Sequence, residues 1–152
     1  MSEAPPARAR VATAVLLAAA AAVAFALRPA DPDRALAERL IGPAARVPGG
    51  GPPAFHNGRK AVLFFERPGV QGLIRGAVVL EGDAVADVLV LTSTEGHDGR
   101  VLQSPGFLAS FRGRPARPPV VVDSVTGASV SSRLLIDAVN DRLRWWSTEA
   151  PR

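Results

Sequence analysis

The sequence predicts an α+β fold in which helices flank a twisted, mainly antiparallel sheet, preceded by one N-terminal transmembrane helix. Three observations predict this fold. Val11–Leu27 is uncharged and almost wholly apolar, while Gly72–Glu81 and Ala84–Thr92 are two runs rich in Val and Leu on either side of a Gly-Asp turn. Val130–Trp146 repeats apolar residues at the spacing of an amphipathic helix. A chain of 152 residues has room for one domain and an appendage.

The apolar run at the N-terminus predicts contact with a membrane. Its 17 residues are at the lower limit for a helix that spans the hydrocarbon core. Two interpretations stay open, because the run can be a retained signal anchor, which we favour, or a secretory signal cleaved after Ala24-Phe25-Ala26. Both interpretations carry the rest of the chain across the membrane. We therefore expect a single-pass protein of the cell membrane with its domain on the extracytoplasmic, periplasmic side.

A short helix and a linker are expected between the membrane and the domain. Asp31–Ala45 has apolar and charged residues on opposite sides of a helix, and the Gly- and Pro-rich run Pro48–Pro53 then stops regular structure. We expect globular structure to begin near Asn57. The expected divisions are a cytoplasmic N-terminus at 1–10, the transmembrane run at 11–27, the membrane-proximal helix and linker at 28–56, the domain at 57–148 and a tail at 149–152.

The domain is expected to be built on three long strands. Lys60–Glu66 is a strand candidate, followed by the hairpin described above, and the nearly continuous apolar character of the hairpin indicates a sheet covered on both faces. Thr94–Gly106 is polar and rich in Gly, so we expect a loop, with one helical turn at Phe107–Phe111. Pro119–Val122 is expected to form a short strand, and Val130–Trp146 the last helix.

Composition excludes several classes of function. The chain has no cysteine, which excludes disulfides, Cys-ligated iron–sulfur clusters and covalently attached c-type haem on this chain. Two histidines are too few for an all-histidine metal site. The net charge of +4 invites a nucleic-acid role, but basic and acidic residues are nearly balanced after Arg28. We therefore expect no nucleic-acid partner.

The run Asp123–Ser132, with the sequence DSVTGASVSS, is the candidate site. It lies between an expected strand and the last helix. Its glycine lets backbone approach a phosphate, its hydroxyls can donate hydrogen bonds, and the N–H groups at a helix start attract anions. The residues alone favour a simpler alternative, in which Ser131 or Ser132 caps a helix that begins at Arg133.

The same run resembles the flavinylation motif of the FMN-binding domain family. That family includes the G subunit of the Rnf complex and the C subunit of the sodium-pumping quinone reductase. Its pattern is an Asp, two spacers, a Thr or Ser, Gly-Ala and a final Thr or Ser. The matching residues in this chain are Asp123, Thr126, Gly127, Ala128 and Ser129.

The resemblance implies a cofactor and a role for each residue. A separate flavin transferase would move FMN from FAD onto the Ser129 hydroxyl and leave a phosphoester. Thr126, Ser131 and Ser132 would lie near the phosphate, and Asp123 would serve transferase recognition or turn geometry. Glu95, in the loop before the motif, would contact the flavin ring.

The expected function is electron transfer. The resemblance implies a membrane-anchored FMN flavoprotein that passes electrons between other redox subunits of a membrane chain, rather than a stand-alone enzyme. Two alternatives stay open: a non-redox extracytoplasmic module that binds a phosphate or a peptide at the turn, and a flavin-dependent reductase or redox sensor domain.

Overall fold

The computed structural model describes residues 16–17, 31–94 and 96–150, and it describes only the backbone of His97 and Asp98. The chain divides into two compact units, Met1–Pro32 and Asp33–Arg152, and nearly all of the described residues belong to the second. The expected transmembrane run lies outside the described residues except for Leu16 and Leu17. Among the helices in the described ranges, none has the length and apolar character needed to cross a bilayer.

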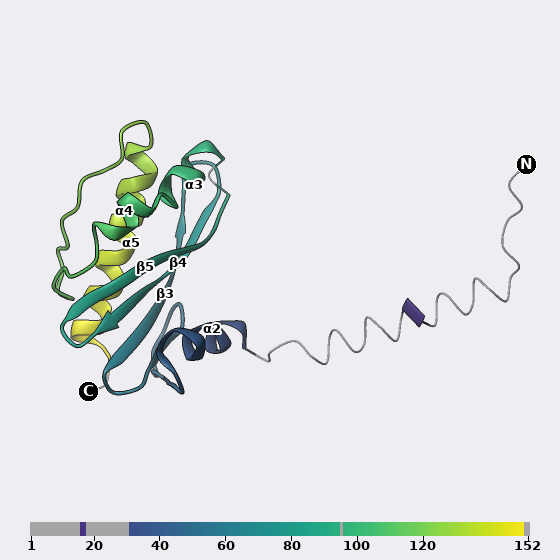
Figure 1. Ribbon diagram of the computed structural model, residues 1–152, viewed down its shortest axis with the longest axis vertical. Helices are drawn as coiled ribbons and strands as arrows, with labels where there is room; N and C mark the ends of the chain where they lie inside the picture. Colours follow the sequence, from purple (N-terminus) through teal and green to yellow (C-terminus); the bar gives the residue numbers. More distant parts are fainter. Residues whose placement is uncertain (1–15, 18–30, 95, 151–152) are drawn as a thin grey trace, which may run out of the picture. The chain divides into compact units, whose positions relative to one another are not determined.

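The second unit is an α+β domain built on one open, five-stranded antiparallel sheet (Figure 1). The strands lie side by side in the order in which they occur along the chain. The elements, in chain order, are α2 (Pro32–Ile41), β1 (Ala45–Arg46), β2 (Ala54–His56), β3 (Lys60–Pro68), β4 (Leu73–Glu81), β5 (Ala84–Ser93), α3 (His97–Leu102), α4 (Pro105–Ala109) and α5 (Ser129–Thr148).

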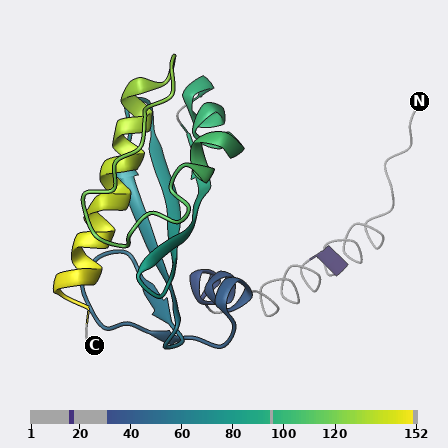
Figure 2. The same cartoon turned by 60° about the vertical axis from the view of Figure 1, so that its left-hand side comes forward.

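Helices cover both faces of the sheet, as the sequence predicts. Alternate residues of β3 point to opposite faces: Leu63 and Phe65 join the core under α5, whereas Val62 and Phe64 join the core under α2. Figure 2 shows α5 and α2 on the two sides of the sheet. The larger core also takes in buried residues of α3, α4 and the turn after them, namely Leu102, Phe107 and Phe111.

The strongest sequence patterns are confirmed. The hairpin forms as β4 and β5, with Gly82 in the turn at a φ of +58°. The first long strand and the last helix form within two residues of their expected limits. The expected helix from Asp31 also forms, but it ends at Ile41 because Gly42 has a φ of +82° and a proline follows.

The expectation that folded structure begins near Asn57 is wrong. β1 and β2 precede that residue, and Ala54 and Phe55 of β2 are buried in the two cores. The Gly- and Pro-rich run between these strands is also held in place, because Arg142 Nη2 donates a hydrogen bond to the Pro52 carbonyl at 3.1 Å. Strands of two and three residues are too short to produce a recognisable alternating pattern.

Two expectations about the segment between β5 and α5 are also wrong. The segment 94–106, expected to be a loop, contains α3 and the beginning of α4. Pro119–Val122 is extended but is not a strand of the sheet. Its partner is a side chain: Val120 N–H donates to Asn140 Oδ1 at 2.6 Å, and Asn140 Nδ2 donates to the Val120 carbonyl at 3.1 Å. The Asn140 side chain of α5 thus makes the two backbone hydrogen bonds that a neighbouring strand would make.

Candidate functional site

The candidate motif forms the beginning of α5, the longest helix of the domain. Ser129 is the first helical residue, Ala128 is the N-cap, and no side chain caps the helix. The helix therefore does not begin at Arg133, so the interpretation of Ser131 or Ser132 as a simple cap is wrong. The first N–H groups of a helix have no partner within it and carry a partial positive charge. Ser129 lies at such a helix start.

A tight turn precedes the helix. Ala128 N–H donates to the Val125 carbonyl at 3.1 Å, so the chain reverses over Thr126 and Gly127. Gly127 has a φ of +85°, a conformation that other residues adopt only with strain. A glycine is thus needed at the position where the sequence motif has one.

Ser132 fixes this turn from inside the protein. Its hydroxyl donates to the Ala128 carbonyl at 2.7 Å and accepts a hydrogen bond from Val125 N–H at 3.2 Å. Both Ser131 and Ser132 are fully buried. The two serines therefore lie behind the turn, away from the surface on which an external phosphate would be placed.

The remaining polar residues of the motif face solvent. Asp123, Thr126, Gly127 and Ser129 are all exposed, whereas Ala128 is buried. In the described part of the chain, the Ser129 hydroxyl makes one long hydrogen bond, to the Val125 carbonyl at 3.5 Å. The hydroxyl is therefore accessible from solvent.

A groove of about 580 Å³ adjoins the turn. One wall is α4 with the turn that follows it, and the other wall is the extended segment before the motif. Val125 contributes to this groove and also accepts the Ser129 hydrogen bond, so the groove and the hydroxyl are neighbours. We call it the Phe107 groove; its lining residues are Ser104, Gly106, Phe107, Ser110, Arg114, Val121, Val122, Asp123 and Val125.

The Phe107 groove has a volume within the range of small-molecule and cofactor sites. Its lining is mixed, with polar and apolar residues on both walls. Phe107 packs edge to face on Phe111 with 5.6 Å between ring centroids, and Ser110 Oγ donates to the Phe107 carbonyl at 2.5 Å. On the other wall Val120 is held by Asn140. Each wall is thus held by hydrogen bonds, within the α4 wall and from Asn140 to the segment of Val120.

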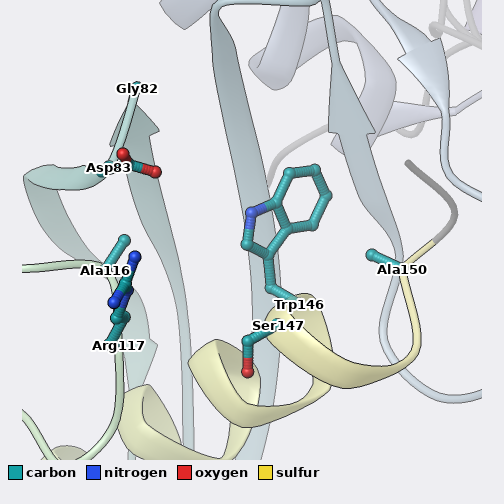
Figure 3. Close-up of a pocket in the computed structure, with 7 residues that line it drawn as sticks. All are labelled: Gly82, Asp83, Ala116, Arg117, Trp146, Ser147 and Ala150. Atoms are coloured by element: carbon teal, nitrogen blue, oxygen red, sulfur yellow. The ribbon is translucent and has the colours of Figure 1, made fainter.

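A second hollow lies at the other end of α5. The Trp146 pocket, of about 350 Å³, has Asp83 and Arg117 on one side and the indole of Trp146 on the other (Figure 3). At 1.5 Å per helical residue, Trp146 is about 25 Å along α5 from Ser129. The Trp146 pocket is therefore remote from the motif and does not form one site with it.

Some site residues escape sequence reasoning, and one expected residue cannot be placed. Glu95, the expected ring contact, lies outside the described residues. Phe107, Ser110 and Arg114 come beside the motif only through tertiary packing, and the sequence holds no local signal for them. No grouping of His, Cys, Asp or Glu able to hold a metal ion occurs in the described ranges.

No protein-family model matches the chain, and no curated protein matches it significantly.

Proposed function

We propose that this protein carries FMN attached through its phosphate to Ser129 and passes electrons between partner redox proteins of a membrane chain. The observation that carries the proposal is the exposed Ser129 hydroxyl at the start of a 20-residue helix, directly beside a groove of about 580 Å³. The sequence around that hydroxyl has the pattern of a flavinylation motif.

The residues present fit the phosphate end of FMN. The Ser129 oxygen is the acceptor: it bonds to the FMN phosphorus as the pyrophosphate bond of FAD breaks, AMP leaves, and the hydroxyl proton passes to the transferase. The exposed Thr126 hydroxyl and the N–H groups at the start of α5 are suitable donors to the remaining phosphate oxygens. Gly127 has no side chain, and the space that a Cβ would occupy has no atom within 4 Å. A phosphate can therefore approach the backbone at this position.

The Phe107 groove fits the ring end. Its accessible apolar residues Val121, Val122 and Val125 can pack on the isoalloxazine, and the polar side chains on both walls can meet its heteroatoms. Bound FMN supplies a ring that accepts and releases one or two electrons. The protein holds that ring at an open surface, where another redox protein can reach it.

The proposal also places the domain at a membrane. The apolar run Val11–Leu27 would anchor the protein in the cell membrane, with the domain on the periplasmic side. A covalent phosphoester prevents loss of FMN in a compartment where free flavin would diffuse away. The partners would be a flavin transferase and the redox subunits before and after this one in the chain.

The test is to produce the full chain together with a flavin transferase and measure its intact mass and its fluorescence in a denaturing gel. We expect a mass gain of one FMN less one water, with fluorescence that survives denaturation. Ser129→Ala should remove both signals, because the acceptor oxygen is gone. Ser129→Thr should keep both, because it retains an acceptor hydroxyl.

Ser124→Ala is the matched control, since Ser124 is an exposed serine of the same motif outside the helix. This variant should be modified like the wild type. An unmodified wild type, in the presence of a transferase that modifies a known substrate, would refute covalent attachment. The non-redox module that binds a phosphate or peptide at the same turn would then be the better proposal.

A further inference from the structure

Two arginines that are close in sequence differ in whether their charge is neutralised. Arg112 donates to both carboxylate oxygens of Asp87, at 3.0 and 3.1 Å, and this pairing raises the pKa of its guanidinium. Arg114 lines the Phe107 groove. Among the residues that the structure describes, no carboxylate lies within ion-pairing distance of Arg114. Its guanidinium therefore lies on the groove wall without an ion-pair partner among the described carboxylates.

The position of Arg114 is fixed by the backbone on both sides. Val85 N–H of β5 donates to the Arg114 carbonyl at 2.8 Å, and Gly113 N–H donates to the Val85 carbonyl at 2.8 Å. The side chain is also held, because Arg114 Nε donates to the Ser110 carbonyl at 3.3 Å. Arg114 thus places a permanent cation on one wall of the groove.

The other charged group that lines the groove is Asp123, on the opposite wall. A cation and an anion have opposite effects on a ring that gains negative charge. If Arg114 is neutralised, Asp123 remains as the charge lining the groove and opposes that gain. The two charges of the lining balance, so removal of Arg114 leaves the groove with a net negative charge.

We propose that Arg114 sets the reduction potential of the flavin held in the Phe107 groove, by stabilising the negative charge that the ring gains on reduction. This inference rests on the proposed function. Uptake of two electrons from a donor protein and one proton from water leaves one negative charge on the isoalloxazine. A fixed cation near that charge favours the reduced form and raises the potential.

The experiment compares flavinylated wild type, Arg114→Gln, Arg114→Lys and Arg112→Gln by spectroelectrochemical titration with dithionite and mediators. Intact mass first establishes that each protein carries flavin. For Arg114→Gln we expect a more negative potential, equivalent to a roughly tenfold smaller equilibrium constant for reduction, the size expected for one charge at a partly exposed site. Arg114→Lys should stay near the wild type because it keeps the charge.

Arg112→Gln is the matched control, since Arg112 is also exposed but is paired with Asp87 outside the groove. It should leave the potential unchanged. If the flavin-carrying Arg114→Gln protein has the same reduction potential as Arg112→Gln, the role of Arg114 is overturned and the proposed function stays intact. A wild type without flavin would overturn both. Equal shifts in the Gln and Lys variants would also overturn the proposal, because they would show an effect of packing and not of charge.

Discussion

At the scale of single residues, buried and exposed hydroxyls within one motif have different tasks. Ser129 is exposed and available for chemistry, whereas Ser132 is buried and joins the two ends of the turn. The order of polar residues in the sequence does not reveal this division. It depends on tertiary packing: Ser129 is the first residue of α5 and is exposed, whereas Ser132, about one turn further along the same helix, is covered by the core.

Ser132→Ala tests the structural half of that division. The change leaves Val125 N–H without its acceptor in a partly buried position, so we expect a loss of about 1–2 kcal/mol in the free energy of unfolding. We also expect slower flavinylation of Ser129, because the turn before it loses a fixed point. Urea unfolding and the time course of mass gain measure the two effects. Ser147→Ala, at an exposed helix position, should change neither, and equal stability of the Ser132 variant would contradict the role assigned here.

At the scale of secondary structure, the extended segment before the motif depends on α5 instead of on the sheet. Asn140 makes two hydrogen bonds to the backbone of Val120, and the next residues, Val121 to Asp123, line the Phe107 groove. The shape of the groove therefore depends on a side chain that is not part of it. One amide side chain performs the task that a strand backbone performs elsewhere in the domain.

Replacement of Asn140 by Ala should release this segment. Two backbone groups of Val120 would lose their partners, so we expect faster amide exchange across 119–123 and a stability lower by about 1–3 kcal/mol. Hydrogen-exchange mass spectrometry and urea unfolding check this. Asp137→Ala, on the exposed side of the same helix, is the control. Unchanged exchange in the Asn140 variant would show that packing alone holds the segment.

Elements with a long local sequence pattern could be predicted, whereas elements that depend on tertiary contacts could not. The β4–β5 hairpin and α5 carry long periodic patterns and a Gly-Asp turn, so local sequence was sufficient for them. α3 and α4 have six and five residues and form because Leu102 and Phe107 are buried by other elements. The motif was visible because it is contiguous. The groove beside it was not, since tertiary packing brings its two walls together.

At the scale of the whole molecule, the sheet needs a helix on each face. α2 buries Ala37 and Ile41 against Phe55 and Phe64, and without it that apolar face would be open to water. The residues from α2 to β2 are therefore part of the fold. Arg142 of α5 also contacts the segment before Asn57, because it donates a hydrogen bond to the Pro52 carbonyl. Its guanidinium carbon lies 4.3 Å from the centre of the Trp145 ring.

Truncation tests this dependence. A chain that begins at Asp31 should fold as a monomer with a cooperative thermal transition, since it keeps α2, β1 and β2. A chain that begins at Asn57 should aggregate or melt far earlier, because it lacks Phe55 and exposes Val62 and Phe64. Size-exclusion chromatography and circular dichroism distinguish the two. Equal melting temperatures would mean that the second face of the sheet does not need its cover.

The strand order of the sheet also bears on the timing of modification. Because each strand pairs with the one synthesised just before it, the sheet can assemble progressively with short loops to close. α5 comes last, and the turn, the buried Ser132 and the wall formed by Val121 to Val125 take their places only when that helix docks. A transferase that met the growing chain would find Ser129 without its surroundings. Attachment of a cofactor at Ser129 would accordingly follow folding and mark the chains that have completed it.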